Sequence, residues 1–256
     1  MNRLPVLLSI PHSGTRVPEE VKSRVCLTKS DLFDDTDAFS REIYDLDSRV
    51  VEVVGTEIAR AFIDLNRAPN DLPPKNPDGV VKTLTCYEKP IYHQGRELDR
   101  KLTVSLLRRY YHPYHLRIRE VVRRPGVTLA LDCHSMASEG PAISPDTGLK
   151  RPMVCLGNRN GRSCDRETTE KLADCFRKAF ALTVRQVRIN YPFAGGFITR
   201  TYGNKPLPWI QVEINRALYL VPPWFDRDTL EMDSERLREL NYMFETALRM
   251  FFSPAG

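Results

Sequence analysis

Short apolar runs alternate with longer amphipathic segments along the whole chain. Apolar and β-branched runs predict strands over residues 5–10, 50–54, 59–63, 127–132, 153–156, 184–189 and 209–214. Apolar residues at near-helical spacing predict helices over residues 28–46, 96–122, 165–180 and 230–252. Strands that alternate with helices are typical of a layered α/β fold, and we expect three layers, α/β/α, around a mixed, mostly parallel sheet.

Proline and glycine mark the ends of several elements. Residues 66–78 are rich in Pro and Asn and predict a loop, whereas Pro125 and Gly126 end the helix that precedes them. Pro113 is expected to kink that helix, because proline removes a backbone hydrogen-bond donor. Neither an internal repeat nor a low-complexity linker divides the sequence, so we expect a single domain over residues 1–256.

The composition is that of a soluble globular protein. Of the 256 residues, 41% are hydrophobic and 28% are charged, which excludes a mainly disordered or fibrous chain. No apolar run approaches the roughly 20 residues that cross a bilayer. The first ten residues lack the apolar core and the cleavage site of a signal peptide, so we expect a cytoplasmic protein without a membrane partner.

The charge balance is mildly positive, with 38 Lys and Arg against 33 Asp and Glu. The two signs alternate along the chain instead of gathering in basic clusters, which argues against nucleic-acid binding. A small positive excess suits a small anionic substrate. The six cysteines form no CxxC pair, and in a chain of this size we expect reduced thiols.

Polar residues suited to catalysis lie where several predicted strands end. His12, His134 and Glu213 lie at the ends of the first, fourth and seventh predicted strands. The third predicted strand leads into Asp64, Leu65, Asn66 and Arg67, and Arg67 falls in a predicted loop. Functional residues of α/β sheets gather at the carboxyl ends of the strands, so we expect these side chains to meet.

Two histidines and a carboxylate make the donor set of a catalytic zinc site, which commonly has three protein ligands and a water. His12 and His134 supply the imidazoles, and Glu213 is suited to take the proton of the water. Asp132 precedes His134 by two residues, so both point to the same side of an extended strand and Asp132 is placed to position that ligand. Arg67 suits a bidentate pair with a substrate carboxylate.

Each of these residues also has an ordinary structural explanation when it is taken singly. A histidine at a strand end is more often a packing or turn residue than a ligand, and a single glutamate there is usually solvated. The sequence contains neither an HExxH nor a CxxC signature. The four strand ends taken together, and not any one of them, favour a metal site.

A set of short motifs gives the chain a family resemblance. The strings SIPHSGTRVP, DDTD, DLNRAPND, YHQG, YHPYH, LDCHSM, NYPFAGGFITRTYG and VEINR occur in this order between about residues 8 and 217. Together they resemble the N-formylglutamate amidohydrolases, a family similar in fold to zinc carboxypeptidases and to aspartoacylase-type deacylases. The resemblance implies a zinc-exopeptidase-like fold.

The resemblance also implies an activity and roles for particular residues. The activity is zinc-dependent hydrolysis of the N-formyl amide of N-formyl-L-glutamate to formate and L-glutamate, at the end of a histidine-degradation route. His12 and His134 become zinc ligands, and Glu213 becomes the general base and later the proton donor. Arg67, with Asn66, binds a carboxylate of the substrate, which is a small anionic amino-acid derivative.

The third metal ligand departs from the carboxypeptidase pattern. Three residues after the first histidine, where carboxypeptidases carry a Glu, this chain has Thr15. The carboxylates of the DDTD motif are the best candidates, and we prefer Asp37 to Asp35. Glu19 and Glu20 are alternatives, although they resemble solvated turn residues.

The remaining polar residues receive weaker roles. Arg200 is a candidate for a second anion contact, because the substrate has two carboxylates. Asn215 and Arg216 follow the base and are candidates for orienting it or for contacting substrate. His112 and His115 lie three apart on a predicted helix and share a face, where an ordinary polar patch is favoured over a metal pair.

Two other classes of function fit the same residues. The first is hydrolysis of a different substrate, either another N-acyl amino acid or, as in a carboxypeptidase, a short peptide with a free carboxylate. The second is a non-catalytic protein that binds acidic amino-acid derivatives. The joint presence of both histidines and of the glutamate argues against the second class. The donor set also accepts divalent ions other than zinc.

Overall fold

Six strands form the centre of the molecule, which the computed structural model describes over residues 3–142 and 144–253. The strands are β1 (Leu4–Ile10), β2 (Val50–Gly55), β3 (Leu129–Met136), β4 (Val154–Gly157), β5 (Val187–Ile189) and β6 (Trp209–Asn215). Across the sheet their order is β2-β1-β3-β6-β4-β5. The first four in this order run parallel, whereas β4 runs antiparallel to β6 and parallel to β5. The sheet is therefore mixed and mostly parallel, as predicted.

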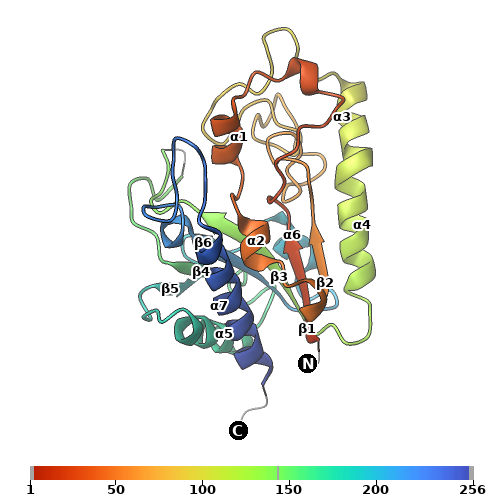
Figure 1. Cartoon of the computed structure of the whole chain (residues 1–256). Coiled ribbons are helices and arrows are strands. Elements are labelled where there is room, and N and C mark those ends of the chain that lie inside the picture. The colour runs from red at the N-terminus through yellow and green to blue at the C-terminus, as the bar shows by residue number, and fades with distance from the viewer. Residues whose placement is uncertain (1–2, 143, 254–256) are drawn as a thin grey trace.

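Helices cover both faces of this sheet (Figure 1). The α-helices of the described residues are α1 (Lys29–Asp35), α2 (Ser40–Tyr44), α3 (Arg100–Leu106), α4 (His112–Val121), α5 (Arg166–Ala179), α6 (Phe197–Tyr202) and α7 (Ser234–Phe252). Helices α3 and α4 lie along one flank of the sheet, and α5 and α7 lie along the other (Figure 1). This arrangement confirms the predicted three-layer α/β/α architecture.

The two faces of the sheet bury two separate hydrophobic cores. Along β1, Leu8 contributes to the core under α5 and α7, whereas the neighbouring Leu7 contributes to the core under α4. Successive side chains of a strand point to opposite faces, so a strand that is buried on both faces needs an apolar residue at nearly every position. This explains why the strands appear in the sequence as continuous apolar runs.

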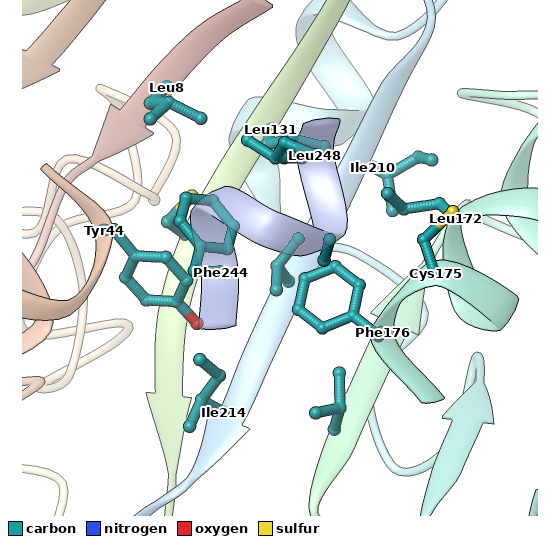
Figure 2. Packing of buried hydrophobic residues seen from close by; sticks show 14 of the residues in the cluster. Leu8, Tyr44, Leu131, Leu172, Cys175, Phe176, Ile210, Ile214, Phe244 and Leu248 are labelled. Atoms are coloured by element: carbon teal, nitrogen blue, oxygen red, sulfur yellow. The ribbon is translucent and has the colours of Figure 1, made fainter. Parts of the chain in front are cut away.

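Aromatic rings join α2, α5 and α7 in the first core (Figure 2). Phe244 of α7 is fully buried, and its ring centroid lies 4.9 Å from that of Tyr44 and 6.1 Å from that of Phe176. The Tyr44 hydroxyl donates a hydrogen bond to the carbonyl of His134 at 2.7 Å. This core therefore packs directly against the part of β3 that carries His134.

The segment predicted as one helix over residues 28–46 is broken in the structure. Thr28 caps α1 through a capping box, but α1 ends at Asp35 and α2 begins at Ser40. Between them Phe39 adopts a φ of 59°, and the backbone N–H of Asp37 donates to the carbonyl of His12 at 3.2 Å. The prediction of a single helix is wrong, because contacts with the β1 end override helical periodicity at residues 36–39.

The long helix predicted over residues 96–122 begins four residues later and contains a π-helical turn. Asp99 caps α3 by accepting a hydrogen bond from the Leu102 amide at 2.8 Å. The π-helical turn η3 (Leu107–Tyr111) separates α3 from α4, and Pro113 stands in the first turn of α4. Proline cannot donate the hydrogen bond of a regular α-helix, and the π turn accommodates this loss.

Residues 59–63 form no strand, contrary to the prediction. Ala59 makes only an isolated bridge to Gly14, and the rest of this segment is irregular although it is almost fully buried. A short apolar run indicates burial, and burial alone does not select a strand. The unpredicted short helix α6 lies in the segment that follows the glycines at 195 and 196.

The sequence predicted reduced thiols and no membrane-spanning segment. All six cysteines are free thiols, and four of them are buried. In the described residues, none of the helices has the length and apolar character that crossing a bilayer requires.

Candidate metal centre and its cavity

Neighbouring parallel strands bring the two histidines to one edge of the sheet. His12 follows β1 by two residues, and His134 lies within β3, which pairs with β1 in parallel. Glu213 of β6 stands directly beside His134 in the register of the β3–β6 pair. Asp37 reaches the same edge from the break between α1 and α2. The sequence prediction that these strand-end residues meet is thus matched by the geometry.

Three ligand atoms converge at this point. His12 Nδ1 lies 3.3 Å from Asp37 Oδ2, His134 Nδ1 lies 3.0 Å from the same oxygen, and the two Nδ1 atoms are 3.2 Å apart. All three residues are buried. Zinc bonds of 2.0–2.1 Å in a tetrahedral site separate the ligands by about 3.3 Å. The spacing of these three atoms therefore fits a single zinc-sized cation.

Carboxylates behind the two imidazoles orient the Nδ1 atoms toward one another. His12 Nε2 donates to Asp64 Oδ1 at 2.8 Å, which leaves the lone pair of its Nδ1 for the centre. His134 Nε2 lies 3.2 Å from Asp132 Oδ2, a buried oxygen with no other partner among the described residues. Carboxylates in these positions commonly fix metal-bound histidines. The carboxylates behind the two imidazoles therefore also fit a metal site.

The electrostatics of the centre favour positive charge. Burial alone would raise the pKa of Asp37, but hydrogen bonds from His12 and His134 outweigh it and hold that pKa well below its usual range. Burial opposes charge on His134 as well, yet Asp132 and Asp37 raise the pKa of this imidazole well above its usual range. Buried carboxylates therefore surround the two imidazoles, and a cation bound between them would be stabilised.

Asp35, the second candidate for the third ligand, lies elsewhere. Its carboxylate accepts a hydrogen bond from the backbone N–H of Cys86 at 2.7 Å and pairs with the buried Lys82 at 3.3 Å. The alternatives Glu19 and Glu20 pair with Lys22 and Arg109 at the surface, and neither lines the cavity described below. Among the carboxylates considered from the sequence, the geometry brings only Asp37 into the cluster with the two histidines.

Glu213 is held by a neighbour that the sequence analysis missed. Gln211 Nε2 donates to Glu213 Oε1 at 2.7 Å, and Gln211 Oε1 accepts a hydrogen bond from the Gly196 amide at 2.6 Å. Burial raises the pKa of Glu213 to about 7. Gln211 precedes Glu213 by two residues in β6, so the two side chains share one side of the strand, and this spacing in the sequence could have identified Gln211.

A cavity of about 760 Å³ opens above this cluster. Five arginines line it, namely Arg60, Arg67, Arg151, Arg200 and Arg216. Arg67 pairs with Asp78 at 2.8 Å, and Arg151, which the sequence analysis did not single out, makes a two-pronged pair with Asp146 at 2.7 and 2.8 Å. Arg200 is exposed, and within residues 3–142 and 144–253 no carboxylate pairs with it. The predicted anion contacts Arg67 and Arg200 thus both face the cavity.

The two predicted asparagine contacts have different positions. Asn66 lines the cavity, but its Oδ1 accepts a hydrogen bond from the Ile198 amide at 2.8 Å and its Nδ2 lies 3.2 Å from His134 Nε2. Its amide therefore bonds to the start of α6 and lies beside the His134 ring. Asn215, predicted to bind substrate, does not line the cavity. It is fully buried, and among the described residues its side chain bonds only to the backbone of residues 151, 152 and 217, so the structure corrects that prediction.

His115 is buried, and both of its ring nitrogens form hydrogen bonds within the protein. Its Nε2 donates to the carbonyl of Leu65 at 3.0 Å, and its Nδ1 accepts from the Tyr202 hydroxyl at 2.9 Å. The Tyr111 hydroxyl donates to the carbonyl of Arg67 at 2.8 Å. His112 is exposed. This arrangement favours the polar patch over the metal pair, and it shows how η3 and α4 fix the backbone of residues 65–67.

Comparisons with known proteins agree with the motifs. A profile of the family described as N-formylglutamate amidohydrolase matches residues 4–220. The chain is 30% identical over 227 residues to N-formylglutamate deformylase of Pseudomonas putida, covering 85% of this chain and 82% of that protein. It is 28% identical over 251 residues to N-formylglutamate deformylase of Pseudomonas aeruginosa, covering 93% and 91% of the two chains. The expected family is confirmed.

A solved structure has the same fold. The crystal structure of N-formylglutamate amidohydrolase from Ralstonia eutropha JMP134 superimposes with a TM-score of 0.78 at 23% identity. The superposition covers 98% of this chain and 94% of that one. This likeness supports the arrangement of the sheet and its two helical layers.

The buried His115 predicts a specific pH dependence of stability. Burial lowers its pKa from 6.5 to about 4; Arg119 and His112 act in the same direction, whereas the hydrogen bond to the Leu65 carbonyl and the charge of Asp132 oppose the shift. Between pH 4 and pH 6.5 the unfolded chain binds a proton at this histidine that the folded chain does not. The contribution of the neutral His115 to the free energy of unfolding is therefore complete above pH 6.5 and is lost as the pH falls. The loss approaches about 3 kcal/mol at pH 4.

We expect His115→Gln, which retains an N–H donor for the Leu65 carbonyl, to lack this component. Urea unfolding at pH 7.5, 6 and 5 measures it. The free energy of unfolding of the wild type should fall more steeply toward pH 5 than that of the variant. Equal slopes in the two proteins would contradict a neutral, buried His115.

Proposed function

Because the chain belongs to the N-formylglutamate amidohydrolase family, we propose that it hydrolyses N-formyl-L-glutamate to formate and L-glutamate with the help of a bound zinc ion. The observation that carries this proposal is the convergence of His12 Nδ1, His134 Nδ1 and Asp37 Oδ2 at mutual distances of 3.0–3.3 Å. The names of the Pseudomonas relatives support the substrate.

His12, Asp37 and His134 would hold the ion. A zinc ion bound at such a centre polarises the carbonyl oxygen of an amide and lowers the pKa of a water molecule toward neutrality. The two imidazoles and one carboxylate carry a single negative charge in total, so they leave part of the charge of a divalent cation uncompensated. That residual positive charge suits a negatively charged transition state in a buried site.

Glu213 is the proton carrier in this proposal. Gln211 occupies Oε1, which leaves Oε2 to accept the proton of the attacking water. A general base works best when its pKa lies near the working pH, and burial brings the pKa of Glu213 to about 7. The protonated Glu213 then donates the proton to the amine of the departing glutamate. One side chain thus serves both halves of the reaction.

Two arginines match the two carboxylates of the substrate. Arg67 Nε lies 3.6 Å from Asp64, which itself contacts His12, so Arg67 is close to the metal centre. The α-carboxylate of N-formylglutamate is adjacent to the scissile amide, and we assign Arg67 to it. Arg200 is exposed at the cavity wall and is assigned to the side-chain carboxylate, which lies farther from the scissile bond.

The metal assignment predicts that variants of the ligands lose both zinc and activity, whereas a variant of the proton carrier loses activity alone. His12→Ala and His134→Ala should each lower the zinc content of the purified protein, and the double variant should lose zinc and hydrolysis together. Glu213→Gln should retain equimolar zinc while kcat falls about 10²–10⁴-fold, because only proton transfer is removed. Elemental analysis and a formate-release assay measure both quantities.

His112→Ala serves as the control for this comparison, because His112 is exposed and does not line the cavity. It should retain both zinc and activity. Full zinc content and full hydrolysis in the double histidine variant would refute the proposed function.

The arginine assignment predicts a change in substrate preference. N-formyl-L-glutamine lacks only the side-chain carboxylate, so Arg200→Met should reduce the preference of the enzyme for N-formylglutamate over this analogue. Arg67→Met should lower kcat/KM for both substrates, by roughly 10–100-fold, since a hydrogen-bonded charge pair contributes about 1.5–3 kcal/mol. Arg123→Met, at an exposed site outside the cavity, is the control.

The measurement is kcat/KM for the two substrates with each variant. An unchanged preference in Arg200→Met would remove Arg200 from the site. A normal kcat/KM in Arg67→Met would contradict its contact with the α-carboxylate.

A further inference from the structure

Arg216 reaches from the end of β6 to the segment that carries the third ligand. It is the first residue after β6, and its side chain is 16% exposed. Its Nη2 donates to the carbonyl of Thr36 at 2.6 Å and lies 3.4 Å from Asp37 Oδ1. Its Nε donates to the hydroxyl of Ser135 at 3.1 Å. One guanidinium thus joins the residue after His134 to the residues at and before Asp37.

The two oxygens of the Asp37 carboxylate have different partners. Oδ2 faces the Nδ1 atoms of His12 and His134, whereas Oδ1 faces Arg216. A carboxylate that is held on both sides has one orientation, so Oδ2 points to the centre before any metal binds. The Arg216 contact is therefore arranged to select which oxygen becomes the ligand.

The segment around Asp37 depends on donors from outside itself. Residues 36–39 lie between α1 and α2, where the regular helical hydrogen bonds are interrupted. Arg216 donates to the Thr36 carbonyl, and the Tyr219 hydroxyl donates to the Ala38 carbonyl at 2.9 Å. Buried carbonyls need such partners. The turn that follows β6 thus supplies donors on both sides of Asp37.

We propose that Arg216 is a positioning residue for the third metal ligand, holding Asp37 Oδ2 in line with the two Nδ1 atoms. The proposal rests on the metal centre of the proposed function. The planar guanidinium presents its N–H groups in a fixed fork, and this fork matches the Thr36 carbonyl and the Asp37 carboxylate together. An ammonium group in the same place has no such geometry. Residues that orient metal ligands typically change metal affinity by 10–100-fold when they are replaced.

A role for Arg216 in binding substrate would change the kinetics and not the metal affinity. Arg216 also lines the cavity, and an arginine that binds a substrate carboxylate would affect KM while leaving metal affinity unchanged. The contacts of Nε and Nη2 with Ser135, Thr36 and Asp37 favour the positioning role, because these groups already occupy both of those nitrogens.

The test measures metal binding by the full chain without substrate. Arg216→Met and Arg216→Lys are stripped of metal, and the affinity for Zn²⁺ is measured by competition with a coloured chelator. The visible absorption of bound Co²⁺ reports the coordination geometry. We expect Arg216→Met to bind Zn²⁺ roughly 10–100-fold more weakly than the wild type and to show an altered Co²⁺ spectrum. Arg216→Lys should also bind more weakly than the wild type.

Arg227→Met is the matched control. Arg227 bonds to Asp34 at 2.8 Å and to Ser30 at 2.9 Å, so it holds the same α1 region without touching Asp37 or lining the cavity. This variant should bind Zn²⁺ as the wild type does. A comparable loss in Arg227→Met would show that any loosening of α1 weakens the site, and it would overturn a specific role for Arg216.

The outcomes separate this inference from the proposed function. If the wild type binds neither Zn²⁺ nor Co²⁺ at the three ligands, the proposed function fails and this inference fails with it. If the wild type binds Zn²⁺ and a folded Arg216→Met binds it equally well, only the role of Arg216 is overturned. If Arg216→Met does not fold, Arg216→Lys decides in its place, and wild-type affinity in that variant overturns the proposal.

Discussion

The close approach of three buried acceptor atoms is the constraint on which the rest of this structure depends. Two imidazole nitrogens and a carboxylate oxygen lie 3.0–3.3 Å apart, away from water. Lone pairs at this distance repel one another unless a proton or a cation lies between them. The sheet, the break between α1 and α2 and the turn after β6 all hold these atoms in place, so the fold maintains an arrangement that favours a bound cation.

Charge is arranged in layers around this centre. The carboxylates of Asp64 and Asp132 lie behind the two imidazoles, and Arg216 lies behind Asp37. Each inner group therefore has an outer group of opposite polarity, which fixes its orientation and its protonation state. Glu213 stands apart from this scheme, because its main partner is the neutral amide of Gln211 and burial brings its pKa to about 7. It is thus the group in the centre best suited to exchange a proton near neutral pH.

Sequence patterns predicted those parts of the site that follow from the sheet. The apolar runs located β1, β3 and β6, and the rule that functional residues gather at carboxyl ends then brought His12, His134 and Glu213 together. The position of Asp37 was different, because helical periodicity over residues 28–46 concealed the break that lets it reach β1. Asp64 lies in a buried irregular segment that had the composition of a strand. Alternation along β6 places Asn215 on the side of Glu213, which is why the sequence favoured a substrate contact. Asn215 is the last residue of the strand, however, and its side chain bonds to the backbone of residues 151, 152 and 217, a set of contacts that only the folded structure reveals.

A zinc-loaded crystal examined at the zinc absorption edge tests the central claim most directly. The account predicts one anomalous peak at about 2.0–2.2 Å from His12 Nδ1, His134 Nδ1 and Asp37 Oδ2, with the two Nε2 atoms turned toward Asp64 and Asp132. A stoichiometric zinc bound elsewhere, or held through Asp35 in place of Asp37, would contradict it.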